Sequence, residues 1–493
     1  MKRSGALALI LIAVVLLAPQ LSMEAQIPSN HRLKAQSEGL VQNVPYVWQE
    51  INGLCAWAAT SAAVQAAGVD LDLHDVLAAT SVGFSFAYVR YNDTWLIYPG
   101  AIYMQAEPTQ FLADLYGLNL TMYFDTSTPS ADQLVEVWEG RGIHTELLDG
   151  QNDALALMRS TIDEGYPLLV SVNPAWLPAA DYDYLRDLGA SGGAHGILIV
   201  GYNDTDSSAT IIDPGVGSFG DNFGYPEDGR GNYTKITYTN LIQAWSDRYF
   251  ITVLLKSGGT PAENPSKFLG EYIRDKLLGT ASAYYADPST AVLWRFGEAA
   301  FRGLSEDFTV DGLSEYFDIF TGMNGEQEFK AQLLTFLGLG LEAQVSLQYL
   351  AYRTSVDALP GLMPDIDLTK FLTAGREALP HFEAITDNST LVYPNNLTAQ
   401  EGPVASLFIG MADEYNSTGD WESVLTAHQS ELDEISNHLL GIADSWLAAG
   451  NALAEIWPNN PIVIFGPYLI LAAFAAGAIV IVAVVIIRKK PSQ

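Results

Sequence analysis

The chain contains a single cysteine, Cys55, so no internal disulfide bond can hold its 493 residues together. A fold without cross-links is stabilised by the burial of apolar surface. Hydrophobic residues make up 49% of the sequence, and the chain is long enough for two hydrophobic cores. The lone thiol is either an inert buried side chain or a reactive group, and the residues around it must distinguish the two.

Both ends of the chain carry uncharged apolar runs. Residues 1–25 combine a basic start, the run Ala6–Leu17 and small residues before Ala25, a pattern typical of a secretory signal peptide. An uncleaved N-terminal anchor is the alternative. The run Ile462–Ile487 holds no charged residue and is long enough to cross a bilayer, so it predicts one C-terminal transmembrane helix.

The charges around the second run predict its orientation. Residues 488–493 begin with Arg-Lys-Lys, and basic residues favour the cytoplasmic side of a membrane. Trp457 and Tyr468 lie toward the other end, where aromatic rings suit the interface. We therefore expect a single-pass type I protein of the cell membrane, with its bulk extracellular or luminal.

The composition of the bulk is acidic. The net charge is −33, from 24 basic and 57 acidic residues, which argues against nucleic acid and against an anionic membrane surface as partners. Seven Asn-x-Ser/Thr sequons permit a glycosylated ectodomain without requiring one. They are Asn92, Asn119, Asn203, Asn232, Asn388, Asn396 and Asn416.

Residues 41–256 predict an α+β domain in which helices come first and strands later. The periodicity and the positions of glycine predict helices after Cys55 as far as Gly68 and over 108–117 and 153–165. Short runs rich in β-branched and aromatic residues predict strands over 167–173, 195–203, 209–214 and 249–255.

Beyond a linker at 257–266, rich in Gly, Pro and Ser, the strand signal fades and residues 267–457 predict an all-α domain. In its last segment, apolar residues recur at alternating steps of three and four. This seam predicts a core-facing helix of a bundle, with a homodimeric stalk as the alternative. Its members are Leu432, Ile435, Leu439, Ile442, Trp446, Ala449, Leu453 and Ile456.

Cys55 stands at the start of the alanine-rich run "CAWAATSAAVQAAG", which predicts a helix ended by Gly68. The first turn of a helix offers unpaired N–H groups and the positive end of the helix dipole, and both favour a thiolate. The position therefore suits a nucleophile, and a small buried hydrophobe is the alternative reading.

A base for that thiol is best sought at His195, which begins the strand "HGILIVGYN" with Gly192, Gly193 and Gly196 around it. Asp213 ends the next strand. If the two strands form a hairpin whose turn is centred near 203–206, His195 lies across from Asp213 to within one residue. The hairpin would then supply a His–carboxylate pair of the kind that activates a nucleophile. A turn role before Pro214 is the alternative for Asp213.

The oxyanion formed during acyl transfer needs a donor besides the Cys55 backbone N–H. Gln49, six residues before Cys55 in "VPYVWQEINGLC", carries an amide that could reach back across the turn. An ordinary surface glutamine is the alternative.

The segments "VPYVWQEINGLCAWAA", "GGAHGILIVGYND" and "IIDPG" resemble the signature segments of papain-like cysteine peptidases. They are most similar to the bacteriocin-processing, double-glycine peptidase-like family and its stand-alone relatives. The resemblance covers about Val41 to Leu255. It implies a papain-like domain, with a Cys-bearing helix packed on an antiparallel sheet that carries His and Asp. It departs from the family at Ala56-Trp57, where Gly-Pro or Gly-Ala is common, and no ATP-binding cassette follows.

Carried over residue by residue, the resemblance implies Cys55 as nucleophile, His195 as general base and acid, Asp213 as its orienting group and Gln49 as oxyanion donor. It implies a peptide or protein substrate and no metal or organic cofactor. The leading hypothesis is thus a membrane-anchored extracytoplasmic cysteine peptidase. The alternatives are a transglutaminase-like or NlpC-type acyl transferase, and a catalytically silent ectodomain for adhesion or ligand binding. The helical region is expected to present the domain above the membrane.

Overall fold

The computed structural model describes residues 37–50, 53–91, 94–100, 106–183, 194–215, 224–225, 230–279, 285–287, 292–386 and 402–458. The predicted signal peptide, the run 462–487 and the tail 488–493 lie outside these residues, as do the sequons at Asn92, Asn388 and Asn396. Among the described residues, none of the helices combines the length and the apolar character needed to span a membrane.

In the described part of the chain, the first half forms an eight-stranded sheet with the order β5-β4-β10-β6-β7-β8-β9, and β1 pairs with β7 beside that path. Neighbouring strands are antiparallel except β4 and β5, which are parallel. The strands are β1 (Glu38–Leu40), β4 (Leu118–Asp125), β5 (His144–Leu148), β6 (Leu168–Val172), β7 (His195–Asn203), β8 (Ser208–Ile212), β9 (Thr234–Thr237) and β10 (Thr252–Ser257).

The helices of this half pack around the sheet, and α2 lies against β7 and β6. Helix α2 is rich in alanine, and nine of its twelve residues are buried, so its backbone can approach the strands closely. Gly68, at φ +94°, follows its end, as the sequence predicts. The helices are α2 (Cys55–Ala66), α3 (Leu73–Ala79), α4 (Ala106–Tyr116), α5 (Ala131–Glu139), α6 (Gln151–Asp163) and α8 (Tyr238–Ser246), with 3₁₀ turns at Val82–Phe84, Pro174–Trp176 and Ala180–Tyr182.

The α+β prediction is confirmed, and the predicted strand at 195–203 has the bounds of β7. The predicted order of helices before strands is wrong, because β4 and β5 precede most of the sheet. These two strands form a parallel pair joined through α5, and such a pair requires a crossover connection that the sequence pattern does not reveal.

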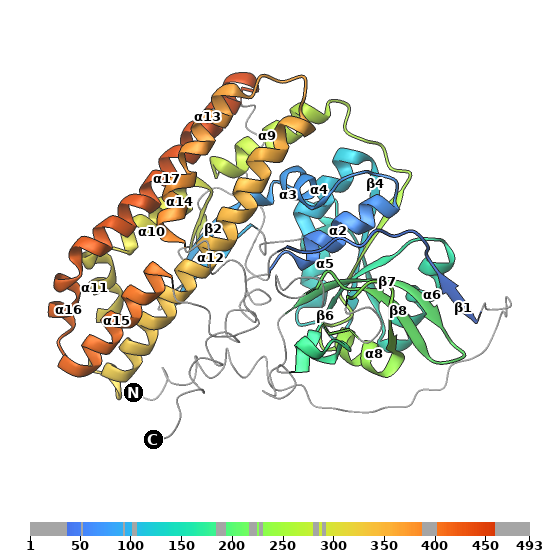
Figure 1. Cartoon of the computed structure of the whole chain (residues 1–493), viewed down its shortest axis with the longest axis horizontal. Coiled ribbons are helices and arrows are strands. Elements are labelled where there is room, and N and C mark those ends of the chain that lie inside the picture. The colour runs from blue at the N-terminus through green and yellow to red at the C-terminus, as the bar shows by residue number, and fades with distance from the viewer. Residues whose placement is uncertain are drawn as a thin grey trace.

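The second half is mostly helical, and Figure 1 shows its long helices on the left, running roughly side by side. The predicted seam lies on α17, where all its members except Ile456 are buried within the chain, so the core-facing reading is confirmed and the seam is not free for a dimeric stalk. The helices are α9 (Pro265–Leu277), α10 (Glu298–Asp307), α11 (Val310–Asp318), α12 (Glu326–Leu362), α13 (Thr369–Glu377), α14 (Leu379–Ile385), α15 (Pro403–Thr418), α16 (Trp421–Ala427) and α17 (Gln429–Ile456).

Trp457 is a correction to the sequence prediction. Its side chain is only 9% exposed, and a Cβ atom on Gly270 of α9 would lie 2.0 Å from its ring. The guanidinium of Arg274 donates a hydrogen bond to its carbonyl oxygen. Trp457 thus fastens α17 to α9, and its ring is packed inside the protein and is not free to lie at a membrane interface.

The second half is not all-α, which corrects a further prediction. Strands β11 (Tyr285–Asp287) and β12 (Val292–Phe296) join β2 (Phe86–Tyr91) and β3 (Thr94–Pro99) in a sheet of order β11-β12-β2-β3. Figure 1 shows β2, in blue, among the yellow and orange helices of the second half. Each hairpin alone has too few strands to be stable, and pairing the two removes that weakness.

Aromatic packing fixes this shared sheet. The ring of Phe86 stacks on Phe301 of α10 with centroids 4.1 Å apart, and Trp95 stacks on Tyr316 of α11 at the same distance. Helix α12 also contacts α3 and β3. The boundary predicted at 257–266 therefore separates two segments of sequence, but the hairpin 86–99 crosses it in space.

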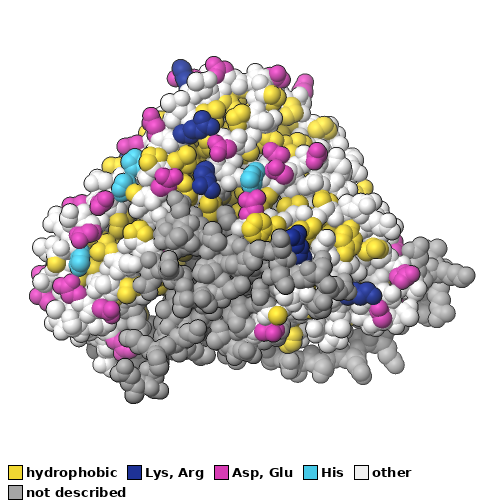
Figure 2. Space-filling model, viewed as in Figure 1, with side chains coloured by type: hydrophobic (Ala, Val, Ile, Leu, Met, Phe, Trp, Pro, Cys, Tyr) yellow, Lys and Arg dark blue, Asp and Glu magenta, His cyan; other side chains and the backbone are white. Residues whose placement is uncertain are grey.

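The surface carries the acidic excess of the sequence. Figure 2 shows Asp and Glu side chains scattered over the described part of one face, with Lys and Arg sparse among them.

Candidate active site

Cys55 is the first residue of α2 and is partly exposed. No side chain caps the start of this helix and no acidic residue lies in its first turn, so nothing there opposes a negative charge. Two backbone N–H groups point to the sulfur, one from Ala56 and one from Gly196, whose nitrogen lies 3.4 Å from Sγ. The helix start thus favours the thiolate, as the sequence predicts.

His195 begins β7 and is nearly buried, with 6% of its surface exposed. The next residue, Gly196, lies against the backbone of Ala56, and this close approach brings the imidazole to the start of α2. The side chains of His195 and Cys55 lie close enough for each to change the pKa of the other. Of the glycines that surround His195 in the sequence, Gly192 and Gly193 lie outside the described residues.

The charges of the pair stabilise each other. Burial raises the pKa of the Cys55 thiol, but the adjacent His195 charge and the backbone N–H groups of Gly196 and Ala56 help to outweigh burial and hold that pKa below its ordinary value. Burial lowers the pKa of His195, but the Asp213 and Cys55 charges outweigh it and raise the pKa to about 10. The arrangement therefore favours a thiolate–imidazolium pair.

Asp213 is completely buried and holds the far side of the imidazole, with His195 Nε2 2.7 Å from Oδ1. Burial raises the pKa of this carboxyl, but the His195 charge and several hydrogen bonds outweigh burial and keep the pKa below its ordinary value. One of these bonds comes from the Gly215 N–H, 2.8 Å from Oδ1. Asp213 is thus a buried carboxylate, and it fixes which nitrogen of His195 faces Cys55.

The hairpin that brings His195 and Asp213 together has a different register from the predicted one. The prediction places Leu198 opposite Thr210 or Ile211, and the observed partner is Ile212. The turn spans 204–207, one residue later than predicted, and this displaces the register near the turn. A β-bulge between Ile199 and Gly201 reverses part of the displacement, so the pairing beyond it lies closer to the predicted one. The His–Asp contact survives because Asp213 lies just beyond the end of β8, where its side chain can reach His195.

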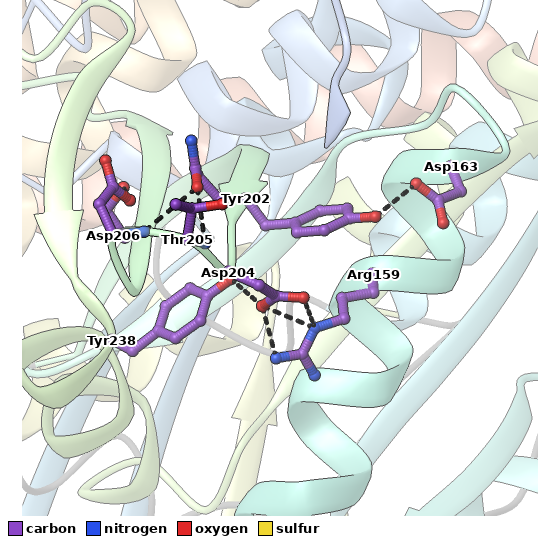
Figure 3. Close-up of polar contacts among 9 residues, drawn as sticks. Arg159, Asp163, Tyr202, Asp204, Thr205, Asp206 and Tyr238 are labelled. Atoms are coloured by element: carbon purple, nitrogen blue, oxygen red, sulfur yellow. Dashed lines mark hydrogen bonds and ion pairs between the residues drawn. The ribbon is translucent and has the colours of Figure 1, made fainter. Parts of the chain in front are cut away.

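A polar network fixes the turn end of this hairpin (Figure 3). Arg159 of α6 forms a bidentate ion pair with Asp204, with Nη2 2.8 Å from Oδ1, and the hydroxyl of Tyr238 donates to the same carboxylate. On β7 the hydroxyl of Tyr202 donates to Asp163 at 2.8 Å. The network joins α6 and α8 to the turn end of the hairpin, away from His195.

Gln49 lies near the end of the hairpin, because its backbone N–H donates to the carbonyl of Pro214 at 3.1 Å. Its side chain is fully buried, and neither its amide nitrogen nor its amide oxygen has a hydrogen-bond partner among the described residues. Burying an unpaired amide is costly, so this residue resembles a donor held ready for a group that the protein alone does not supply.

The second half of the chain reaches the segment that precedes Cys55. Gly53, at φ +102°, lies against Leu347 of α12, and a Cβ atom on Gly53 would come within 2.9 Å of the Leu347 side chain. Gly53, two residues before Cys55, is therefore packed against the helical half. Among the described residues, no group of three or more His, Cys, Asp or Glu side chains is placed to hold a metal ion.

Two residues that the sequence analysis did not single out also reach the site. The hydroxyl of Tyr182 donates to Asp213 Oδ2 at 2.9 Å and lies 3.2 Å from His195 Nε2. The hydroxyl of Tyr225 donates to the same Oδ2 atom. Neither tyrosine belongs to a recognisable sequence motif, so no signal in the sequence could have identified them.

Comparison with known proteins gives a match over this part of the chain. The model of a family described as Peptidase_C39 like family matches residues 41–241, the range that contains every side chain of the candidate site. A crystal structure from Bacillus anthracis described as a C39-like peptidase is similar at 14% sequence identity and a TM-score of 0.25. The similarity covers 45% of this chain and 99% of that one. No curated protein matches the chain.

Proposed function

We propose that the chain is a cysteine peptidase, because the model of the Peptidase_C39 like family matches residues 41–241. Cys55 is the nucleophile of the proposed reaction and His195 its general base and acid. Asp213 orients the imidazole, and Gln49 with the Cys55 backbone N–H stabilises the oxyanion.

The proposed reaction proceeds in two stages. The Cys55 thiolate attacks the carbonyl carbon of a peptide bond, and the tetrahedral oxyanion accepts hydrogen bonds from Gln49 and the Cys55 N–H. His195 gives its proton to the leaving amine, which departs as the thioester forms. A water molecule then loses a proton to His195 and attacks the thioester, releasing the acid and restoring the thiolate.

One observation carries the proposal: the buried chain of contacts from the Cys55 thiol through His195 to Asp213, with a 2.7 Å contact at its far end. A buried imidazole between a thiol and a carboxylate is expensive in a merely structural role, because two charges are held out of water. The unpartnered amide of Gln49 is a second, independent support.

The test combines labelling with hydrolysis. Iodoacetamide should label Cys55 rapidly at a pH where an ordinary thiol is largely protonated, and the labelled protein should no longer cleave peptides. A mixed peptide library should yield fragments with new termini, and Cys55→Ala should yield none. As a matched control, Thr60→Ala on the same helix should retain cleavage. Labelling at the rate of free cysteine would contradict the proposal.

The reaction products also distinguish peptide hydrolysis from the reaction of the alternative enzyme class. In hydrolysis, water accepts the acyl group and every cleaved peptide gains a free carboxyl terminus. In the transglutaminase-like or NlpC-type alternative, mass spectrometry would show an added amine or cleavage confined to cell-wall peptides. A catalytically silent ectodomain would give neither product and would keep its biological effect when Cys55 is replaced by Ala.

We further propose that the described body is extracytoplasmic and joined to a membrane by Ile462–Ile487, on the strength of the two apolar runs in the sequence. The full chain should stay with membranes after an alkaline wash, whereas a chain ending at Pro458 should become soluble. Added protease should reach the body from outside intact cells. Full solubility of the complete chain would contradict this proposal.

A further inference from the structure

The carboxylate of Asp213 is fully buried and has four hydrogen-bond donors among the described residues. Its Oδ1 atom lies 2.7 Å from His195 Nε2 and 2.8 Å from the Gly215 nitrogen. Its Oδ2 atom accepts from the hydroxyls of Tyr182 and Tyr225. Two donors on each oxygen replace the water that a carboxylate loses on burial.

The two tyrosines act on the oxygen that His195 does not touch. A carboxylate whose second oxygen lacked donors would be poorly solvated, and its protonated form would be favoured. Both tyrosine side chains are themselves buried, and burial raises the pKa of each well above its ordinary value. Each hydroxyl therefore keeps its proton and can only donate to Asp213.

Tyr182 has a second contact. Its hydroxyl oxygen lies 3.2 Å from His195 Nε2, so the N–H of His195 is shared between Asp213 and this hydroxyl. The two rings are tilted at 58° with their centroids 5.9 Å apart, so Tyr182 also limits rotation of the imidazole. Tyr225 makes its contact from another segment of the chain, and the two hydroxyls together fix the plane of the carboxylate.

We propose that Tyr182 and Tyr225 are positioning residues of the reaction, which hold Asp213 ionised and oriented so that His195 keeps the proton that the Cys55 thiolate requires. This inference rests on the proposed function. The two tyrosines do not contact the substrate. They orient Asp213, which in turn acts on His195 and so on the Cys55 thiol.

The test uses Tyr182→Phe and Tyr225→Phe in the full chain, since Phe keeps the ring and removes only the donor. In each variant Asp213 takes up a proton at a higher pH, and the neutral group no longer stabilises the imidazolium. The pH profile of iodoacetamide labelling at Cys55 should therefore move to higher pH, with labelling in mildly acidic buffer about tenfold slower. The acidic limb of kcat/KM should move in the same direction.

Tyr202→Phe is the matched control, because it also removes a tyrosine hydroxyl that donates to a carboxylate, Asp163, at the far end of β7 (Figure 3). It should leave the labelling profile of the wild type unchanged. The double variant Tyr182→Phe/Tyr225→Phe should show a larger displacement than either single variant. Thermal denaturation of all variants shows whether each is folded under the assay conditions.

The outcomes are distinct. Tyrosine variants that lose thermal stability but keep the wild-type labelling profile would overturn the inference and leave only a packing role. Peptide cleavage that is indifferent to both substitutions would overturn it while the proposed function stands. A displaced labelling profile in a protein that cleaves no peptide would support the tyrosine roles while the proposed function fails. A wild-type thiol that labels like free cysteine would overturn both.

Discussion

Gly196 lies against Ala56, and a Cβ atom on Gly196 would come within 2.7 Å of the Ala56 Cα. This contact joins the strand that begins with His195 to the helix that begins with Cys55. Only a glycine permits the two backbones to approach so closely here, because the neighbouring atoms are the Cα, N and Cβ of Ala56, which cannot move aside as the end of a flexible side chain would. The distance between the Cys55 thiol and the His195 imidazole therefore depends on Gly196, which has no side chain that could take part in the reaction.

The first prediction concerns this contact. Gly196→Ala should force β7 away from α2, move the His195 imidazole away from the Cys55 thiol, and lower kcat/KM by at least about 100-fold. Steady-state hydrolysis of a cleavable peptide measures the effect. The control is Gly410→Ala on α15, where a Cβ atom would meet nothing within 4 Å, so its activity should match the wild type. A Gly196→Ala enzyme of normal activity would show that the close approach is unnecessary.

The second prediction concerns pH. The pKa of Cys55 is lowered and that of His195 is raised to about 10, so the charged pair forms as pH rises past the thiol value and disappears as pH rises past the imidazole value. In the wild type, the plot of kcat/KM against pH should therefore be bell-shaped, rising past the Cys55 pKa and falling past the His195 pKa. Asp213→Asn removes the charge that raises the His195 pKa, so the alkaline limb should move to lower pH.

The control for the pH prediction is Asp206→Asn. Asp206 lies at the exposed turn of the same hairpin and accepts from the Ser208 hydroxyl, far along the strand from His195. Its pH profile should coincide with that of the wild type. An alkaline limb that stays in place in Asp213→Asn would mean that Asp213 does not set the His195 pKa.

The third prediction concerns Gln49. Its buried amide has no partner among the described residues, so Gln49→Met should remove a polar group without breaking a hydrogen bond. Thermal stability should be equal or higher. Turnover should fall by about 100- to 1000-fold if the amide binds the oxyanion. Labelling of Cys55 by iodoacetamide, which forms no oxyanion, should be unchanged. A slower labelling reaction would indicate that Gln49 acts on the thiol.

The fourth prediction concerns the two halves of the chain. The Gln348 side chain on α12 donates to the Gly83 carbonyl at 2.6 Å and accepts from the Gly100 N–H at 2.7 Å. Gln348→Ala leaves both buried groups unpaired and should lower the free energy of unfolding by about 2 to 4 kcal/mol. Denaturant unfolding measures the loss, with the exposed Gln332→Ala on the same helix as control.

The same substitution tests whether the helical half is a detachable spacer. If the two halves share one cooperative fold, Gln348→Ala should move the whole unfolding transition, followed both by tryptophan fluorescence and by loss of hydrolysis. Removing residues 265–458 should then leave an unfolded remainder, because the hairpin 86–99 would lose its partner strands. A truncated chain that still cleaves a small peptide would favour the spacer.

Local features of the fold were predictable because they depend on residues close in sequence. The alanine-rich run gives α2, the left-handed Gly68 follows its end, and the β-branched run gives β7. The candidate residues Gln49, Cys55, His195 and Asp213 could also be proposed from their motifs. Their catalytic roles stay predictions until the experiments above are done.

Features that depend on distant partners were not predictable. The hairpin register depends on the position of the turn, where the Asn203 carboxamide accepts from two N–H groups, and on a bulge between Ile199 and Gly201. The small sheet required a strand near residue 90 to meet one near residue 293. The roles of Tyr182 and Tyr225 around Asp213 also arise only from contacts between separate segments.

The sequence by itself determined the parts: one thiol at a helix start, one histidine at a strand start, an aspartate after the following strand and a glutamine six residues before the thiol. Helix dipoles, glycine conformation and apolar periodicity act over a few residues, so these features can be predicted from residues close together in the sequence. Only the tertiary structure decided how they meet, since the burial of Asp213, its tyrosine donors and the Gly196–Ala56 approach depend on packing between segments far apart in the chain. A charge can be held in such an interior only when several segments supply its donors together.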